Sequence, residues 1–280
     1  MRVKNILIPT DGSDYSKTAQ DYGIYLARKL GAKLTGLFIM DLKIIQDPLF
    51  DDISGFMGLS STREIYPFIE KGMEERADSI LEDFGERCKK EGIDPGLKKI
   101  RGIVDEMIIE EGEDADCIIL AQRGEHYSLT DGGLLGSTSE SVVRKTGKPV
   151  LVTPLEFKEI RKVGLAYDGG PHAERALKIA AELSITLEST LMVLIITGDD
   201  EETRILSDKV GSFLDPYELQ MSLEIRSGKE EQEIVRFSGE GMVDLLVMGA
   251  YGHSRIRKFI LGSTTSYVIR KSEIPVLLIR

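Results

Sequence analysis

The amino-acid sequence predicts an α/β protein made of two repeated, doubly wound domains, each with a five-stranded parallel sheet. Three observations predict this fold. A short apolar run that ends near an Asp-Gly pair opens each half of the 280-residue chain. The apolar runs are near-continuous stretches of Val, Ile and Leu, as in strands of a sheet that is covered on both faces. Segments with helical spacing separate these runs, which implies right-handed crossovers and parallel strands.

Both halves begin with the same three elements. The first apolar runs lie in residues 3–13 and 161–170, which contain Asp11 and Asp168. The second apolar runs lie in residues 34–40 and 191–196, and the distances from Asp11 to Ile39 and from Asp168 to Ile196 are both 28 residues. A helical segment is predicted between the two runs by apolar residues at helical spacing: Ala19, Tyr22, Leu26, Ala27 and Leu30 in the first half, and Ala176, Ile179, Ala180 and Leu183 in the second.

Both halves also end alike. An apolar run leads into a glycine-containing loop, a Gly-Ser-Thr triplet opens a helix, and a proline introduces the last apolar run. The distances from Gly136 to Pro149 and from Gly262 to Pro275 are both 13 residues. Each half therefore alternates five strands with four helices. We place the domains at residues 1–154 and 162–280, joined by the linker 155–161.

The first half is longer than the second. Asp11 and Gly136 are 125 residues apart, whereas Asp168 and Gly262 are 94 residues apart, and we assign most of the excess to an insertion at about 42–71. Its position after the second strand and its length indicate a mobile cover or an assembly surface. Its apolar residues are too numerous for a free linker: Ile44, Ile45, Leu49, Phe50, Ile53, Phe56 and Met57.

The composition excludes several classes of protein. A formal net charge of −11 argues against a nucleic-acid-binding protein that works by phosphate neutralisation. The longest apolar stretch, residues 191–196, is far shorter than the ~20 residues of a membrane helix. The N-terminal residues do not resemble a signal peptide. We therefore expect a soluble, cytoplasmic protein with no membrane or nucleic-acid partner.

The two cysteines indicate neither a disulfide framework nor a metal site. Cys88 and Cys117 are 29 residues apart, and the chain has three histidines. A structural zinc ion needs four clustered ligands, so no metal site is expected. We interpret Cys117 as a small buried apolar residue and Cys88, on a charged helix, as a solvated thiol.

The glycine-rich loop near the end of the second half has the chemistry of an anion site. Gly249 and Gly252 follow an apolar run, and Gly262-Ser263-Thr264-Thr265 opens a helix whose free amide groups and dipole favour an anion. A capped helix after a flexible loop is the simpler interpretation. The loop is not a Walker A motif, and no G-x-G-x-x-G follows the first strand.

Together these residues resemble a known family. Gly249-x2-Gly252-x9-Gly262-Ser263, with Asp168 after the first strand and the closing PVLLIR, is similar to the nucleotide-binding branch of the universal stress protein family. The whole chain resembles the tandem form, with the segment 42–71 as the main departure. The resemblance implies a Rossmann-like fold of the adenine nucleotide alpha hydrolase-like type. It also implies ATP, ADP or AMP as the bound ligand, with Mg²⁺ accompanying ATP.

The resemblance also implies site residues in both halves. The loop after the first strand would meet adenine and ribose, the end of the second strand would hold adenine through its backbone, and the glycine loop would hold ribose and phosphates. In the second half these residues are Ala166, Tyr167, Asp168, Ile196, Met248, Gly249, Gly252, His253, Arg255, Gly262, Ser263, Thr264 and Thr265. In the first half they are Pro9, Thr10, Asp11, Ile39, Gly124, Gly136, Ser137, Thr138 and Ser139. Asp168 as the centre of an Asx turn and Ile196 as a core residue remain the alternatives.

The second half is predicted to be the stronger site. Between Gly252 and Gly262 the chain carries Arg255, Arg257 and Lys258, formally +3, whereas the corresponding first-half loop carries Glu125 and Asp131, formally −2. The first-half loop is also longer, and Ala121 replaces its first glycine. The second half departs from the family elsewhere, because Ala166-Tyr167 stands where Pro-Thr is usual.

A binding module and an enzyme are the two competing functions. A nucleotide-binding stress or signalling module needs only the site described above. A slow ATP hydrolase or nucleotidyl-transferring enzyme would also need a metal-held phosphate chain and a group that orients the nucleophile. His253 is the candidate base, and a loop histidine is more often a polar contact. We favour the binding module and assign no catalytic residue. A structural scaffold without ligand is the third interpretation.

The last apolar run of each half, residues 150–152 and 276–279, has no charge within it. Exposed edges of this kind favour aggregation, so they should be paired or covered. We predict that the two runs pair within the chain and relate the halves by a pseudo-twofold axis. A homodimer of whole chains stays open.

Overall fold

The computed structural model describes residues 3–42, 66–124, 136–250 and 261–280. The first half contains β1 (Asn5–Pro9), α1 (Asp14–Leu30), β2 (Lys33–Asp41), α4 (Tyr66–Lys90), β3 (Gly96–Gly102), α5 (Val104–Gly112), β4 (Cys117–Ala121), α6 (Ser137–Lys145) and β5 (Val150–Thr153). The second half contains β6 (Lys162–Ala166), α7 (Pro171–Thr186), β7 (Thr190–Ile196), α8 (Asp200–Leu214), β8 (Met221–Arg226), α9 (Glu230–Gly239), β9 (Leu245–Gly249), α10 (Ser263–Lys271) and β10 (Val276–Ile279). The predicted alternation of strands and helices is confirmed in both halves.

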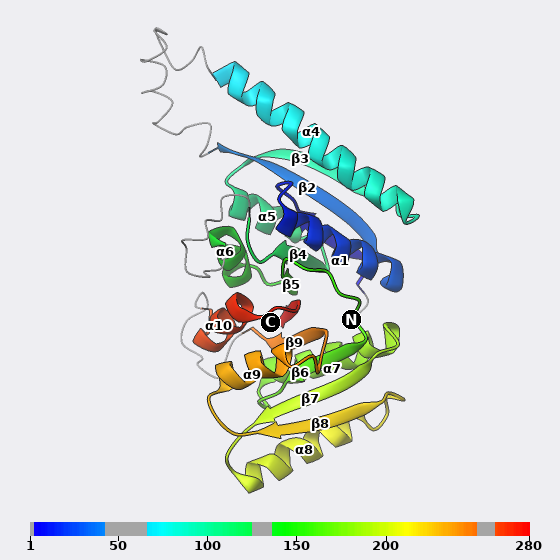
Figure 1. The fold of residues 1–280 in the computed structure, drawn as a ribbon, viewed down its shortest axis with the longest axis vertical. Coiled ribbons are helices and arrows are strands. Elements are labelled where there is room, and N and C mark those ends of the chain that lie inside the picture. Colours follow the sequence, from blue (N-terminus) through cyan, green and yellow to red (C-terminus); the bar gives the residue numbers. More distant parts are fainter. Residues whose placement is uncertain (1–2, 43–65, 125–135, 251–260) are drawn as a thin grey trace.

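The strands of the described residues form one sheet that runs the length of the molecule (Figure 1). Its order is β3-β2-β1-β4-β5-β10-β9-β6-β7-β8, so each half contributes five adjacent strands. Within each half all neighbouring strands are parallel. The predicted α/β class with two doubly wound parallel sheets is therefore confirmed. Strand order reverses beside β1 and beside β6, which is where such sheets bind ligands.

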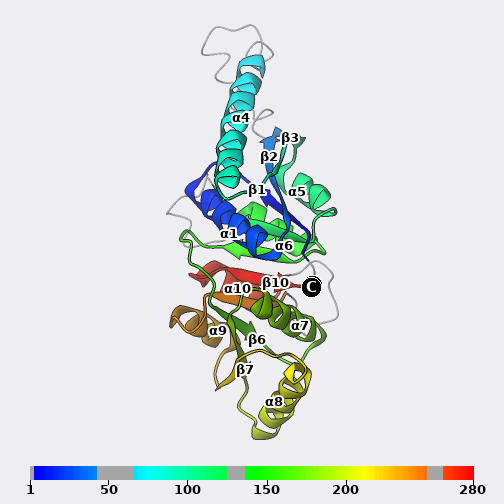
Figure 2. The ribbon, with the colours of Figure 1, turned by 90° about the vertical axis from the view of Figure 1, so that its right-hand side faces the viewer.

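The two halves meet along β5 and β10, which pair antiparallel. Leu277 lies opposite Leu151, and Val276 lies opposite Val152. This confirms the predicted pairing of the two final apolar runs. Helices cover both faces of the sheet (Figure 2), and the buried side chains form a large cluster on each face that draws residues from both halves. A smaller third cluster of Phe38, Met40, Ala77 and Leu81 belongs to the first half alone.

The linker 155–161 lies along α1. The Thr18 hydroxyl donates to the Leu155 carbonyl at 2.6 Å, and the Tyr25 hydroxyl donates to the Ile160 carbonyl at 3.2 Å. The Phe157 ring packs on Tyr22 with 4.8 Å between ring centroids. Burial raises the pKa of Tyr22 to about 12. The linker is therefore fixed to the first half rather than loose between the halves.

Part of the predicted insertion 42–71 is helical. Residues 66–71 form the first turns of α4, which has 25 residues against 15 in its counterpart α8. Part of the excess length is therefore helix. Pro67 is the second residue of α4, and proline is tolerated in the first turn of a helix, where its missing N–H has no partner to lose. Residues 43–65, with all the apolar residues of the insertion hypothesis, lie outside the described residues, so that hypothesis stays a prediction.

The expectation that Cys88 is a solvated thiol is wrong, because its side chain is fully buried. α4 presents Ala77, Leu81, Phe84 and Cys88 at helical spacing, and all four are buried. Burial raises the pKa of Cys88 to about 11 and that of Cys117 to about 12. The burial of Cys117 was predicted and is confirmed. No helix among the described residues is long and apolar enough to cross a membrane.

We expect neither cysteine to react with a thiol reagent in the folded protein. A thiol with a pKa of about 11 has a thiolate fraction of roughly one in a thousand at pH 8, and the thiolate is the reactive form. Titration with Ellman's reagent at pH 8 should release two equivalents of chromophore in denaturant and almost none without it. Rapid release of one equivalent from the native protein would contradict the burial of Cys88.

Candidate functional site

A cavity of about 450 Å³ opens at the carboxyl ends of the second-half strands. It lies where β6 and β9 are neighbours, at the reversal of strand order. The ends of β6, β7 and β9 and the first turns of α7, α9 and α10 form its wall. The lining residues are Ala166, Tyr167, Asp168, Gly170, Pro171, His172, Ala173, Leu194, Ile196, Glu230, Ile234, Met248, Gly249, Leu261, Gly262, Ser263, Thr264 and Thr265.

The start of α10 forms one end of the cavity. Gly262 is the N-cap residue and has no side chain to accept hydrogen bonds from the first amide groups of the helix. These amides and the helix dipole favour an anion. The Thr265 hydroxyl donates to the Ala250 carbonyl at 3.0 Å, which fixes this end of the helix to the loop after β9. Ser263 and Thr264 line the cavity beside it.

The start of α7 faces the same cavity. Gly170 is its N-cap residue and Pro171 its first residue. Asp168 Oδ1 accepts a hydrogen bond from the Gly170 amide at 2.9 Å, so Asp168 does form an Asx turn. Gly169 has a φ of +73°, and a Cβ atom there would lie 2.5 Å from Leu206 on α8. A glycine at position 169 therefore allows both the positive φ of this turn and the close approach of Leu206 on α8.

Gly249 allows β9 to approach α7 closely. A Cβ atom at Gly249 would lie 2.9 Å from the Cβ atom of His172 and 3.3 Å from its carbonyl carbon. The first glycine of the loop motif therefore keeps the helix and the strand together, whereas Gly262 serves the cavity itself. Away from α10, an apolar part of the wall is formed by Leu194, Ile196 and Ile234.

The structure brings together the predicted second-half residues that it describes. Ten of them line the cavity: Ala166, Tyr167, Asp168, Ile196, Met248, Gly249, Gly262, Ser263, Thr264 and Thr265. Gly252, His253 and Arg255 lie outside the described residues, as do Arg257 and Lys258. Two parts of the wall were not predicted from the sequence: the start of α7, with His172, and the start of α9, with Glu230 and Ile234. Both follow the carboxyl end of a parallel strand, and that rule would have found them.

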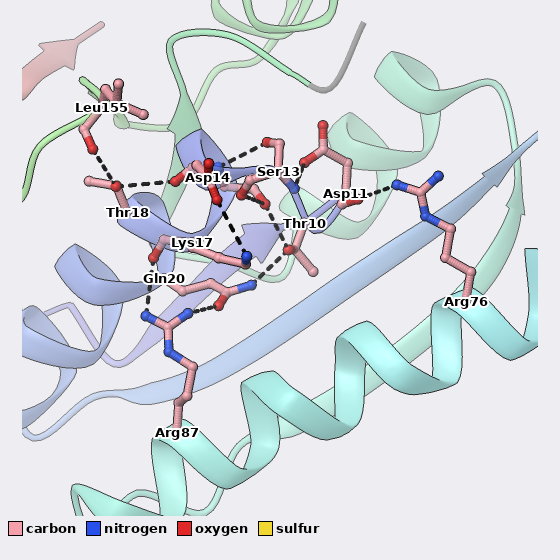
Figure 3. Close-up of polar contacts among 11 residues, drawn as sticks. Thr10, Asp11, Ser13, Asp14, Lys17, Thr18, Gln20, Arg76, Arg87 and Leu155 are labelled. Carbon is pink, nitrogen blue, oxygen red and sulfur yellow. Dashed lines mark hydrogen bonds and ion pairs between the residues drawn. The ribbon is translucent and has the colours of Figure 1, made fainter.

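The first-half loops are tied to their own helices. In Figure 3, Arg76 reaches from α4 to Asp11, whose carbonyl accepts its hydrogen bond at 2.9 Å. Thr10 accepts a hydrogen bond from Gln20 at 2.7 Å, and Gln20 in turn accepts one from Arg87 of α4 (Figure 3). Thr10 and Gln20 are both buried. The Thr10 side chain therefore belongs to a network that joins the end of β1 to α1 and α4.

Other predicted first-half residues also lie at this edge of the sheet. A Cβ atom at Gly124 would lie 3.0 Å from Asp11 Oδ2, and the Gly136 amide donates to the Gln122 carbonyl at 3.0 Å. The Ser139 hydroxyl donates to the Ala121 carbonyl at 2.7 Å, one residue earlier than the position equivalent to the partner of Thr265. Ser137 and Thr138 begin α6, Pro9 ends β1, and Ile39 lies near the end of β2.

The start of α1 is also bonded to the loop after β4. Arg123 donates to the Tyr15 hydroxyl at 2.9 Å and lies over its ring.

Comparison with known proteins agrees with this duplicated architecture. The sequence matches the universal stress protein family twice, over residues 2–154 and 159–280. The chain belongs to the universal stress protein family. A universal stress protein of Synechocystis sp. is 31% identical over 288 residues, covering 99% of this chain and all of the relative. One from Methanocaldococcus jannaschii is 27% identical over 158 residues, covering 56% of this chain and 85% of the relative.

A solved structure shares the fold. The crystal structure of a universal stress protein from Archaeoglobus fulgidus superimposes with a TM-score of 0.76 at 24% identity, covering 98% of this chain and 95% of that one. In this universal stress protein the halves differ at the end of the first strand. The position of Thr10 is taken in the second half by Tyr167, whose side chain is buried, and burial raises its pKa.

His172 is an ionisable side chain that lines the second-half cavity of this universal stress protein. It takes the position of Tyr15, and its Nδ1 atom lies 2.7 Å from Arg175 Nη2. Arg175 can only donate, so Nδ1 accepts and the imidazole is neutral. Burial, then Arg175, lowers the pKa of His172 below its ordinary value of 6.5; Arg280 also lowers it, and Asp168 opposes the shift.

We expect this histidine to destabilise the folded protein in mild acid. Below pH 6.5 the unfolded chain protonates His172 while the folded chain does not, so the free energy of unfolding should fall as the pH drops from 6.5 toward the lowered pKa. His172→Gln should remove this part of the pH dependence. Urea unfolding of both proteins between pH 5 and 7.5 measures it as a difference, and identical pH profiles would contradict the lowered pKa.

Proposed function

We propose that this universal stress protein binds an adenine nucleotide in its second-half cavity and acts as a cytoplasmic stress-response or signalling module. The observation that carries the proposal is the convergence of two helix N-termini, those of α7 and α10, on a cavity with an apolar wall. The volume of about 450 Å³ lies within the roughly 300–1,000 Å³ of small-molecule sites. A nucleotide has the matching polarity, with an anionic chain at one end and a flat base at the other.

The phosphate chain belongs at α10. The amides of the first turn point outward from the helix start, Gly262 has no side chain to block them, and Ser263 and Thr264 place hydroxyl groups beside them. The base belongs against Leu194, Ile196 and Ile234. Asp168 lies in the loop between β6 and α7, where its carboxylate would accept hydrogen bonds from ribose hydroxyl groups. Each group of the nucleotide thus has a complementary surface.

The second half is proposed as the stronger site. In the first half Arg76 bonds to the Asp11 carbonyl in the loop after β1, and Arg123 bonds to Tyr15 at the start of α1. Arg87 reaches Thr10 through Gln20, and a nucleotide would have to displace some of these contacts. The loop charges of +3 and −2 favour the same half. Each charge near a phosphate contributes on the order of 1 kcal/mol in partly solvated surroundings.

We propose binding without efficient catalysis. Hydrolysis of ATP needs a metal-held phosphate chain and a group that orients water. The carboxylates that line the described part of the cavity are Asp168 and Glu230. Asp168 already holds the Asx turn, and Glu230 is exposed at the start of α9. Slow hydrolysis is the alternative, and accumulation of ADP during prolonged incubation with ATP and Mg²⁺ would support it.

The test is to identify what the purified protein carries and binds. Mass spectrometry of the supernatant from heat-denatured protein should detect an adenine nucleotide. Calorimetric titration of the nucleotide-free full chain with ATP, ADP and AMP should give saturable binding, with GTP as the control for the base. Absence of adenine nucleotide in the first experiment and of binding in the second would overturn the proposal and favour a structural scaffold.

A further inference from the structure

The last helix of each half, α6 or α10, ends near the seam, by which we mean the antiparallel pair of β5 and β10 where the two halves meet. A side chain from the other half caps the end of each helix. The side-chain amide of Gln122, in the first half, donates to the Ile269 carbonyl at 2.5 Å and to the Ser272 carbonyl at 3.2 Å, at the end of α10. Both partners are carbonyl oxygens, so the amide nitrogen must face them. In the opposite direction, the Arg280 guanidinium donates to carbonyls at the end of α6, at 3.0 Å for Arg144.

The two caps are not copies of one another. Gln122 and Ala250 hold equivalent positions, because the amide of each donates to the last strand of its own half, at 2.9 Å to Thr153 and 2.8 Å to Ile279. Ala250 has no side chain that could cap α6, so Arg280 does so from the end of β10. The duplicated fold therefore does not by itself supply the Gln122 contact, which is particular to one of the two seam helices.

Gln122 satisfies groups that α10 cannot satisfy alone. The last carbonyls of a helix have no partner within it, and an unpartnered buried acceptor costs about 1–3 kcal/mol. Ile269 and Ser272 are buried, and Gln122 itself is 7% exposed. α10 has nine residues and is therefore about 13 Å long at about 1.5 Å per residue. Its opposite end is the start that lines the cavity.

The helix is thus held at its N-terminal end by its own half and at its C-terminal end by the other. Thr265 bonds to Ala250 near the cavity, and Gln122 bonds to Ile269 and Ser272 at the seam. A short helix that lost its C-terminal anchor could tilt or shift about the Thr265 contact. Such a shift would move the amides of Ser263 and Thr264 relative to the rest of the cavity.

We propose that Gln122 is a positioning residue for the second-half anion site, so that this site is complete only when the first half is docked against it. This inference rests on the proposed nucleotide function. Gln122 does not line the cavity. Its effect should therefore reach the ligand through the orientation of α10 and should fall on the phosphates rather than on the base.

The test compares ligands that differ in phosphate number. In Gln122→Met, which keeps the side-chain length and removes the donor, the affinity of the full chain for ATP should fall about tenfold, that for AMP less, and that for adenosine hardly at all. The matched control is Thr153→Val, which removes a buried hydroxyl of β5 that bonds within the first half, to the Leu120 carbonyl at 3.3 Å. This control should bind all three ligands like the parent protein. Gln122→Asn, which withdraws the amide by one methylene, is the second variant if Gln122→Met does not fold.

Four results would overturn the inference. Unchanged ATP affinity in both Gln122 variants would show that the cap does not position the site. Equal losses for adenosine and ATP, or a phosphate-selective loss in Thr153→Val, would indicate general loosening of the seam. A parent protein that binds neither adenosine nor ATP would instead overturn the proposed function, and the inference with it.

Discussion

Leu277→Lys should separate the two halves of the sheet and lower the free energy of unfolding by about 3 kcal/mol or more. Leu277 is 6% exposed, pairs with Leu151 across the seam, and belongs to the buried cluster that draws on both halves. A lysine there would bury a charge or force the strands apart. Leu277→Met, which conserves volume, should cost less than about 1.5 kcal/mol and serves as the control.

Two measurements detect this separation of the two halves. Urea unfolding gives the loss of stability, and limited proteolysis reports on the linker 155–161. In the parent protein the linker is bonded to α1 through Thr18 and Tyr25, so cleavage requires those contacts to open. The lysine variant should be cut faster in the linker than the methionine variant. Equal resistance of the two variants would contradict a seam formed by β5 and β10.

Gly262→Val should abolish nucleotide binding, with at least a hundredfold loss of affinity, and leave the fold intact. Gly262 has a φ of −59° and a ψ of 147°, which a valine can adopt, and the nearest atom to an added Cβ is Thr265 Oγ1 at 3.7 Å. The backbone therefore tolerates the side chain. Its bulk would instead occupy the cavity at the amides that we assign to phosphate.

Gly136→Val is the matched control in the other half. Gly136 has a φ of −57°, and an added Cβ would lie 3.6 Å from its nearest neighbours, so the local strain is similar. Calorimetry with ATP should show binding in this variant and none in Gly262→Val, while both keep the far-UV circular dichroism of the parent. Full affinity in Gly262→Val would show that α10 does not hold the phosphates, and loss in Gly136→Val alone would move the site to the first half.

The sequence was sufficient for features that depend on short-range pattern. Apolar runs at matched spacings predicted the strands, and the charge-free runs around Leu151 and Leu277 predicted the seam, because an exposed apolar edge must be paired. The second-half site residues could be placed because carboxyl ends of parallel strands meet at one edge of the sheet. Asp168 and Gly262 lie far apart in sequence and line one cavity for this reason.

The features that the sequence did not predict depend on contacts between distant segments. The residues next to Cys88 in sequence are charged, and the burial of its thiol comes from the packing of α4 on the sheet, where Cys88 shares one helix face with Leu81 and Phe84. The contact between Gln122 and the end of α10 spans the seam, and a pattern within one half cannot reveal it.

Hydrogen–deuterium exchange of the full chain with and without saturating ATP tests the central claim most directly, because it reports where the ligand lies without altering the protein. Bound nucleotide should slow exchange of amides in residues 166–173 and 261–266, at the starts of α7 and α10 that line the cavity. The corresponding first-half residues, 9–16 and 136–140, should exchange at the same rate in both samples. Protection of the first-half residues alone, equal protection of both sets, or no protection at saturating ATP would contradict a nucleotide site in the second half.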